Sequence, residues 1–378
     1  MMKNLFEQFE VIEDPRDIRG KRHELINILI MTIYGLLVGM KDFSNIAYYL
    51  DLNKEYFNEL LDLKYGTPSH DCLSDVFAVI DPKRFMEIFI EWTKEIVKKR
   101  TGKLISIDGK AVRNARDKIN KGNVPYIVSA FLSELGISIG QVKVDDKSNE
   151  ITAIPELLDL LDIEGATITI DAIGTQEKIV KKIVSKKGHY VLKAKDNQEG
   201  LEKDIKKYFD KQNNLLGNKE VLHKKTYDKD HGRIEMREYY ISYNVSTIRN
   251  KEKWNTVKAI GYIRVHRTIG DETTITDNYY IMDKEISIEF FERATRSHWK
   301  IENDLHWRLD VILDEDHSRN REGNSISNLS IIRKIVFNLA RLDESYGKGL
   351  PLQRKLTRYM CDFSCIENLI FNVIPSIS

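Results

Sequence analysis

Apolar residues in the first hundred positions recur at three- and four-residue steps, which is the period of a helix with one buried face. Short stretches rich in Gly, Pro and Asp separate these segments, as expected of turns. Ser69 and Asp71 stand where helix N-caps are expected. The pattern predicts a compact helical domain over residues 1–100. Its expected helices cover 24–39, 43–50, 55–63, 72–79 and 83–98.

Beyond about residue 103 the apolar residues alternate, with a period of two in short stretches. Two amphipathic segments with helical spacing interrupt these stretches. The predicted order is β-β-β-α-β-α-β, which implies a mixed sheet flanked by helices, an α/β fold. The expected strands cover 103–112, 124–134, 136–146, 166–172 and 189–196, and the helices cover 153–163 and 176–187.

The second half of the chain changes character twice. A helix is expected over 200–212, and residues 220–283 are then rich in Tyr, Ile, Val and Thr, which favour strands. Helical spacing returns over 288–310 and 325–345. Residues 346–378 are expected to form a C-terminal tail.

Net charge changes this picture little, because 59 Lys and Arg residues balance 58 Asp and Glu residues. The distribution along the chain is more informative. Lys and Arg gather in 94–121, 178–195 and 293–341, whereas acidic residues gather in 142–164. One surface could therefore be basic enough to bind a polyanion. The alternative is that these lysines only solvate helix faces.

The three cysteines, Cys72, Cys361 and Cys365, suggest no disulfide framework, so we expect a reduced, cytoplasmic setting. Cys361 and Cys365 lack further ligands for a zinc site and are expected to be buried thiols. The apolar run Leu25–Met40 is short for a bilayer and is interrupted by polar residues and a glycine, so it predicts a buried helix rather than a membrane span.

Two aspartates lie at the ends of predicted strands. Asp108 follows LISI and Asp171 follows TITI. Side chains alternate across a strand, so each aspartate should share a face with a polar neighbour, Ser106 or Thr169. Small residues follow both, Gly109 in one case and Ala172 and Gly174 in the other. We expect these small residues to let a ligand approach the backbone.

A third acid, Glu302, lies in the predicted helix SHWKIENDLHWRLD. Helical spacing places it on a half-apolar face that also carries Trp299 and Leu305. An unpaired carboxylate on such a face is costly, so its presence there points to a function. Trp299 and Trp307 are expected to lie in the core rather than to stack on bases.

Three convergent carboxylates require a cation, and hard oxygen ligands suit Mg²⁺ or Mn²⁺. Two such ions can activate the attacking oxygen and stabilise the leaving oxygen of a phosphodiester. A strand-end Asp can instead be a simple turn or N-cap residue. A second alternative is a zinc face made by His298, Glu302 and His306 at successive four-residue steps.

These residues fall within longer blocks that resemble the DDE transposases of bacterial insertion sequences, in the group that includes the H-repeat-associated proteins. The resemblance covers nearly the whole chain, including DPRDIRGKRHEL and PSHDCLSDVF in the N-terminal region. Further blocks are IDGKAVR, VSAF, GQVKVDDKSNEITAIPELL, TIDAIGTQ, YVLKAKDNQ, DHGRIEMRE and SHWKIENDLHWRLDVILDEDHSRNREGN.

The resemblance implies a helical transposase-associated domain over 1–100 and an RNase H-like catalytic domain over 101–345. It also implies a β-rich insertion at about 215–285. Matched to the IDG, IDA and IEN blocks, Asp108, Asp171 and Glu302 take the roles of the catalytic, metal-binding triad. The implied activity is metal-dependent cleavage of transposon ends and strand transfer into target DNA.

One family signature is absent. Related transposases carry Tyr-x2-Arg-x3-Glu-x6-Lys around the glutamate, and Thr295, His298 and Leu309 stand at those places here. The DNA contacts of that signature therefore do not carry over, although His298 could replace the arginine as a phosphate donor.

Basic and polar residues near these blocks are expected to contact DNA, with surface salt bridges as the alternative for each. The expected contacts are Lys110, Arg113, Lys195, Gln198, His231, Arg233, Arg237, His298 and Arg319. The expected partners are double-stranded DNA at transposon ends and target, and a second copy of the chain in a synaptic complex. We expect a nucleoid-associated protein of the bacterial cytoplasm. A DNA-binding protein without catalysis, derived from a mobile element, and a nuclease that cuts without joining are the alternatives.

Overall fold

The computed structural model describes residues 4–97, 102–113, 124–144, 150–210, 219–230, 232–345, 347 and 349–372. Contacts between residues divide the chain into two compact units. The first comprises Met1–Arg100, Gly109–Ala153 and Glu302–Ser378, and the second comprises Thr101–Asp108 and Ile154–Ile301. The first unit thus joins the N-terminal helices to two later segments of the chain.

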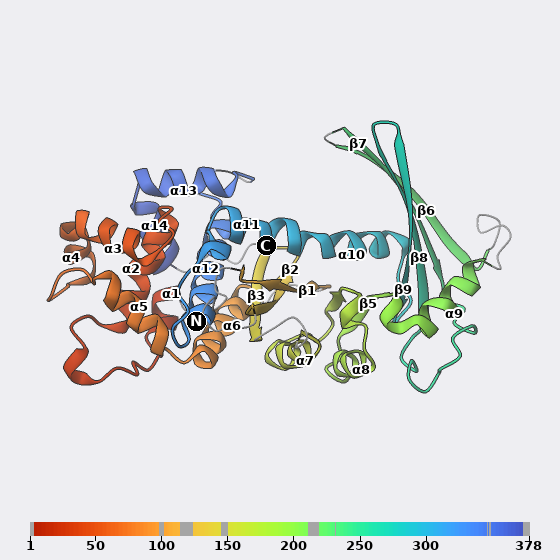
Figure 1. The fold of residues 1–378 in the computed structure, drawn as a ribbon, viewed down its shortest axis with the longest axis horizontal. Coiled ribbons are helices and arrows are strands. Elements are labelled where there is room, and N and C mark those ends of the chain that lie inside the picture. Colours follow the sequence, from red (N-terminus) through yellow and green to blue (C-terminus); the bar gives the residue numbers. More distant parts are fainter. Residues whose placement is uncertain are drawn as a thin grey trace. The chain divides into compact units, whose positions relative to one another are not determined.

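Helices dominate the start of the first unit, as the apolar spacing predicts (Figure 1). Ser69 caps its helix by accepting a hydrogen bond from the Cys72 backbone amide at 3.2 Å. Asp71 is not an N-cap, which corrects the sequence expectation, because the helix already begins at His70. The elements are α1 (Leu5–Phe9), η1 (Ile18–Gly20), α2 (Leu25–Leu37), α3 (Phe43–Leu52), α4 (Lys54–Leu61), α5 (His70–Val79) and α6 (Pro82–Val97).

The apolar run that begins at Leu25 forms α2, which is buried along nearly its whole length. This confirms the expected buried helix. Of the helices in the described ranges, none combines the length and apolarity needed to cross a membrane.

Helix α12 (Ser325–Leu342) is the centre of the first unit and contacts α2, α5, α6 and β3 (Ile137–Val144). Its N-terminal end docks on the end of α5 through backbone contacts. The Asn324 amide donates to the Ala78 carbonyl at 2.9 Å, and Asn328 Nδ2 donates to the Phe77 carbonyl at 2.9 Å. The docking is therefore directional as well as apolar.

The remaining elements of the first unit include a hairpin and the C-terminal helices. Strand β2 (Tyr126–Leu132) pairs antiparallel with β3 and lies next to β1 in the sheet. The C-terminal residues form α13 (Leu352–Cys361) and α14 (Ser364–Phe371). Cys365 is buried as expected, whereas Cys361, the last residue of α13, is exposed, which corrects the expectation of a buried thiol.

The second unit is built on a mixed sheet in the order β1-β4-β5-β9-β8-β7-β6. Strands β1, β4 and β5 are parallel, and β9, β8, β7 and β6 continue the sheet in antiparallel pairs. This arrangement confirms the predicted α/β architecture with an antiparallel extension. The strands are β1 (Leu104–Ala111), β4 (Thr167–Ile170), β5 (His189–Ala194), β6 (Val221–Asp230), β7 (Arg233–Ser242), β8 (Ala259–Ile269) and β9 (Glu272–Met282).

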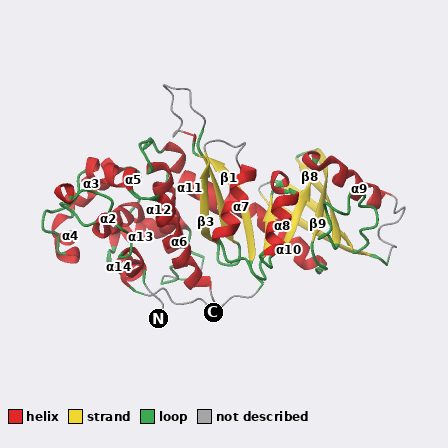
Figure 2. Cartoon of the chain, turned by 90° about the horizontal axis from the view of Figure 1, so that it is seen from below, coloured by secondary structure: helices red, strands yellow, loops and turns green. Residues whose placement is uncertain are grey.

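Helices cover the sheet of the second unit. Helix α10 (Ile288–Lys300) contacts β4, β5, β6 and β7, and its Phe291 and Ala294 belong to a buried core with Tyr239 and Ile241. Helix α9 (Glu199–Asp210) lies beside β8 and β9 (Figure 2). Helix α8 (Glu177–Ser185) packs on β5, and α7 (Glu150–Leu160) precedes β4.

Strands β6 to β9 form a long twisted ribbon whose inner half is stiffened by stacked rings (Figure 1). Tyr262 stacks on Tyr240 and on Tyr279, with ring centroids 5.4 Å apart in each pair. Cross-strand aromatic pairs of this kind stabilise a sheet. The strand-rich segment expected from composition is therefore present.

A first prediction concerns the contact of Gly323 with α5. Gly323 has φ +50°, and a Cβ there would lie 2.4 Å from the Ala78 carbonyl oxygen. Gly323→Ala should lower the free energy of unfolding by about 3 kcal/mol, from left-handed strain and overpacking together. Urea unfolding followed by circular dichroism measures this.

Gly66→Ala is the matched control, because Gly66 has φ +69° but no heavy atom lies within 4 Å of the place that a Cβ would take. It should lose only about 1 kcal/mol, from backbone strain alone. Equal losses in the two variants would show that the Ala78 contact contributes nothing.

Candidate active site

Asp108 and Asp171 lie at the same edge of the sheet in the second unit. Strands β1 and β4 are parallel neighbours, with Ile107 paired to Ile170. Each aspartate directly follows one member of that pair, and both are half-buried. The structure therefore brings together the two acids that the strand pattern singled out.

The polar residues in phase with these aspartates form a buried chain of hydrogen bonds. Thr169 Oγ1 donates to Ser106 Oγ at 3.0 Å, and Ser106 Oγ donates to the Ser297 carbonyl at 3.3 Å. Ser106, Thr169 and Ser297 are all buried. The predicted sharing of one strand face is confirmed, and this face is covered by α10.

His298 continues this chain toward Asp171. Its Nδ1 lies 3.4 Å from Thr169 Oγ1, whose own proton goes to Ser106. Nδ1 is therefore the donor of this contact, and Nε2 keeps its lone pair. Burial lowers the pKa of His298 to about 4, although the charge of Asp171 opposes this. The imidazole is therefore neutral at pH 7, and the expected phosphate contact of His298 stays a prediction.

The glycines after the two aspartates serve internal packing. A Cβ on Gly109 would lie 2.4 Å from the Tyr126 ring and 2.9 Å from the Glu150 carboxyl group. A Cβ on Gly174 would lie 2.2 Å from Ile170. Internal packing therefore accounts for glycine at both positions, because side chains of this chain occupy the space that a Cβ would take. The expected approach of a ligand stays a prediction.

Lys193, which belongs with Lys195 and Gln198 to a polar cluster at a strand end, also lies at this sheet edge. Strand β5 runs parallel to β4 with Leu192 paired to Ile170, so Lys193 lies opposite Asp171 at the same sheet edge. Burial and the neighbouring Lys195 lower the pKa of Lys193, whereas Asp171 raises it. In the sequence, Lys193 follows an apolar strand run, as the two aspartates do.

Glu302 belongs to the first unit, whereas Asp108 and Asp171 belong to the second. It lies in a π-helical segment, Ile301–His306, between α10 and α11 (Trp307–Val311), and its side chain is exposed. A π-helical turn breaks the 3.6-residue period, and such turns often mark functional sites. The predicted single face through Trp299, Glu302 and Leu305 is therefore not formed.

The two tryptophans near Glu302 also differ from expectation. Trp299 is 58% exposed and Trp307 is 54% exposed, so neither lies in the core. Leu305 and Leu309 are buried instead. For Trp307 the change of helical period explains the error, because the expectation assumed one continuous α-helix through Ile301–His306.

Within the described ranges, no three His, Cys, Asp or Glu side chains lie close enough together to hold a metal ion. The zinc alternative of His298, Glu302 and His306 is therefore not formed there. Asp108 and Asp171 still fit Mg²⁺ chemically, since they offer carboxylate oxygens at one sheet edge.

Three of the basic residues expected on DNA are engaged within the protein. Lys110 is only 10% exposed and pairs with Asp310 and with Glu315 at 2.7 Å, so it is not an open phosphate contact. Arg237 pairs with Glu235 and with Asp228. Arg233 Nε lies 3.2 Å from Glu235, although its side chain is partly exposed. Pairing with the buried carboxylates of Glu315 and Glu235 favours an internal salt bridge over a DNA contact for Lys110 and Arg237.

Other expected contacts remain accessible. Arg113 is 81% exposed, and Lys195 and Arg319 are also exposed. Gln198 donates to Gln176 Oε1 at 3.2 Å and accepts from Lys253 at 2.9 Å. His231 lies outside the described residues.

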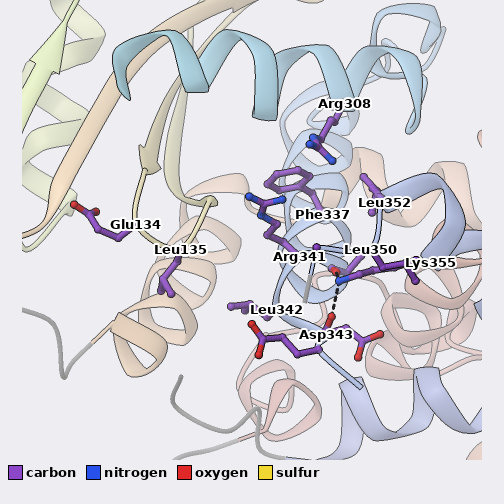
Figure 3. Close-up of a pocket in the computed structure, with 13 residues that line it drawn as sticks. Glu134, Leu135, Arg308, Phe337, Arg341, Leu342, Asp343, Leu350, Leu352 and Lys355 are labelled. Carbon is purple, nitrogen blue, oxygen red and sulfur yellow. Dashed lines mark hydrogen bonds between the residues drawn. The ribbon is translucent and has the colours of Figure 1, made fainter. Parts of the chain in front are cut away.

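A pocket in the first unit lies among residues that the sequence did not single out (Figure 3). Its basic lining residues are Arg308, Arg341 and Lys355, and its acidic lining residues are Glu134, Asp343 and Glu344. The Lys355 ammonium donates to the carbonyl oxygens of Ala340 and Asp343. The lining is balanced in charge and selects no ligand class.

Comparison with known proteins agrees with the sequence blocks. The family model of a transposase DDE domain matches residues 99–339, and that of its associated N-terminal domain, described as DDE_Tnp_1-associated, matches residues 6–93. The "H repeat-associated putative transposase YhhI" of Escherichia coli is 33% identical over 98% of each chain. The "Putative transposase YncI" of E. coli O157:H7 is 35% identical over 94% of this chain and 91% of its own.

A second prediction follows from the depressed pKa of His298. Its folded value of about 4 lies below 6.5, the ordinary value, so unfolding takes up a proton between these pH values. The free energy of unfolding should therefore fall as pH decreases from about 6.5 to about 4, by at most about 3 kcal/mol. NMR titration in metal-free buffer measures the pKa, and urea unfolding measures the loss.

His298→Gln should remove this pH dependence, whereas His70→Gln, at a histidine whose side chain is 58% exposed, should not. An imidazole of His298 that titrates near 6.5 would contradict the assignment.

Proposed function

We propose that this chain, which belongs to the DDE transposase family, cuts DNA at transposon ends and joins the freed ends to target DNA. The proposal rests mainly on one observation: Asp108 and Asp171 follow paired residues of adjacent parallel strands within the matched DDE domain. Glu302 is proposed as the third member of the triad.

The proposed reaction has two displacements at phosphorus. In the first, a water oxygen forms a bond to the phosphodiester phosphorus at the transposon end, and the bond to the 3′-oxygen breaks to free a 3′-hydroxyl. In the second, that hydroxyl attacks a target phosphodiester, and the target 3′-oxygen leaves. Both steps depend on the positioning of the attacking oxygen in line with the leaving oxygen.

Asp108, Asp171 and Glu302 would hold Mg²⁺ or Mn²⁺, with two ions in the complete site. When bound, these ions supply charge that activates the attacking oxygen and stabilises the leaving oxygen. The protein's own contribution is to hold two carboxylates at a fixed separation, since each directly follows one member of the Ile107–Ile170 strand pair. The exposed Glu302 leaves its carboxylate accessible to the ions and the DNA.

Exposed cations of this chain are proposed as phosphate contacts. Arg113 follows Asp108 by five residues, Lys195 follows the end of β5, and Arg319 lies after the Glu302 helix. Lys193, next to Asp171, is added to this set. Binding through such contacts should weaken steeply with salt.

The domain division, the partners and the cellular location are proposed as well. We propose that the chain divides functionally into a helical domain over 1–100, a catalytic domain over 101–345 and a tail over 346–378. It is proposed to act on double-stranded DNA as a homodimer in a synaptic complex, in the nucleoid of a bacterial cytoplasm. A catalytically silent DNA-binding protein is the alternative.

A third prediction tests the triad. Asp108→Asn, Asp171→Asn and Glu302→Gln each remove one charge with little change of shape. Each substitution should reduce Mg²⁺-dependent cleavage of a labelled duplex from the borders of the gene by at least about 100-fold. Loss of a residue that only orients a metal ligand typically costs about 10- to 100-fold. DNA binding, measured by fluorescence anisotropy, should persist.

Glu322→Gln is the matched control, because Glu322 is an exposed acid that follows Glu302 in the chain and lies outside the triad. Retained cleavage in any one triad variant would remove that residue from the site. Normal DNA binding without cleavage by the native chain would favour the silent alternative.

A fourth prediction separates a transposase from a nuclease. A pre-cut donor end with a free 3′-hydroxyl should be joined to a supercoiled plasmid, and the joined product should appear on a gel. A nuclease would give only nicked or linear plasmid. Joining should depend on Asp108, because both displacements use the same site.

A further inference from the structure

Lys110, two residues after Asp108, belongs to a cluster of charges in the interior of the first unit. The Lys110 ammonium pairs with the Asp310 carboxylate and lies 2.7 Å from Glu315 Oε2. Asp316 Oδ1 lies 3.8 Å from the Lys110 ammonium. Glu315 is 2% exposed, so this carboxylate is removed from water and depends on protein partners.

A second layer of buried groups fixes Glu315. Ser330 Oγ donates to Glu315 Oε1 at 2.8 Å, and the Lys334 ammonium donates to Ser330 Oγ at 2.9 Å and to Gln141 Oε1 at 2.6 Å. All four side chains are buried. The cluster therefore joins strand β1, strand β3, the 3-10 turn η8 (Glu315–His317) and helix α12.

The electrostatics of the cluster are balanced. Burial alone would raise the pKa of Glu315, but Lys110, Lys334 and Arg333 outweigh it and hold that pKa well below its usual range. Arg333 also donates through Nε to the Leu313 carbonyl at 3.1 Å. Glu315, Lys334 and Arg333 thus each have directional hydrogen-bond partners.

Stability alone does not account for such a cluster. Replacing a buried ion pair with apolar residues of similar volume is often neutral or stabilising, so buried charge is weak evidence of a stabilising role. The ammonium of a lysine instead offers three donors that set direction as well as distance. Its location suggests what is being held in place.

Lys110 lies two residues after Asp108, and in a strand these two side chains point to the same face. Asp310 lies in α11, in the helical run that begins with the π-helical segment of Glu302. One ion pair thus ties the residues that follow Asp108 to the helix that follows Glu302.

We propose that Lys110 is a positioning residue: held by Asp310 and Glu315, it fixes the end of β1 that follows Asp108 against α11 and η8. This inference rests on the proposed function, in which Asp108 and Glu302 act on the same phosphodiester. Lys110 itself contacts neither metal nor DNA. Its removal would loosen the carboxylate geometry without removing a ligand.

The test compares Lys110→Met with Lys355→Met. Lys355 is a buried lysine of the same unit whose ammonium donates to the carbonyl oxygens of Ala340 and Asp343, away from β1. Three quantities are measured in each full-length variant: Mn²⁺ affinity by calorimetry, hydrogen exchange over residues 104–113, and single-turnover cleavage of pre-bound DNA.

Lys110→Met should weaken Mn²⁺ binding and slow cleavage by about 10- to 100-fold, as is typical when a partner that orients ligands is lost. Exchange over 104–113 should increase, and DNA affinity should stay within about twofold of the native value, since no phosphate contact is lost. Lys110→Arg, which keeps the charge, should recover part of the rate. Lys355→Met should change none of these quantities.

Three outcomes would overturn the proposal. These are native Mn²⁺ affinity and rate in Lys110→Met, equal effects in Lys355→Met, and a large loss of DNA affinity, which would restore Lys110 as a phosphate contact. If Lys110→Met does not fold, Lys110→Met combined with Glu315→Gln removes both charges and takes its place. If the native chain does not cleave DNA, the proposed function fails, and hydrogen exchange over β1 still decides the positioning role.

Discussion

Parallel pairing of β1, β4 and β5 is the constraint on which the candidate site depends. Ile170 pairs with Ile107 on one side and with Leu192 on the other. Parallel strands end at the same sheet edge, so Asp108, Asp171 and Lys193 emerge together there. Buried apolar side chains hold the register on one face of β1 and β4, and the hydrogen bonds of Ser106 and Thr169 hold it on the other. A one-residue slip would move every one of these polar groups to the opposite face. The chemistry proposed for this edge is thus a consequence of how the strands pair.

Most of the fold could be predicted from the sequence because burial imposes a period. The helices of the first hundred residues and the strands from 103 to 196 agree with expectation to within a few residues, since one face of each is apolar. The errors lie where the period carries no information. The π-helical turn at Ile301–His306 breaks the period assumed for the residues after it, and Trp307 is exposed instead of buried. Trp299, which lies in α10 before that turn, is exposed as well. Cys361 was also expected to be buried, but it lies at the end of α13 and is exposed.

Charged residues were harder to place than apolar ones. From the sequence, Lys110 and Arg113 were equivalent: two cations just after a strand-end aspartate. In the structure Lys110 is enclosed by carboxylates of α11 and η8, whereas Arg113 is 81% exposed. The partners of Lys110 lie about 200 residues away in sequence, as the separation of 205 from Glu315 shows. No local pattern encodes a contact between residues so distant in the chain. Sequence therefore identifies candidate cations, and only tertiary packing separates interior ion pairs from surfaces that DNA can reach.

The same distinction applies within the blocks shared with DDE transposases. The IDGK block contains a proposed ligand, Asp108, a glycine confined by Tyr126 and Glu150, and a lysine paired in the interior. The REGN block contains Gly323 and Asn324, which dock α12 on α5 through the Ala78 carbonyl. Resemblance at a block thus records several physical demands at once. A residue in such a block is assigned to DNA only when its polar atoms are exposed and uncommitted to the protein interior. By that criterion the proposed phosphate contacts reduce to a few exposed cations, chiefly Arg113, Lys195 and Arg319.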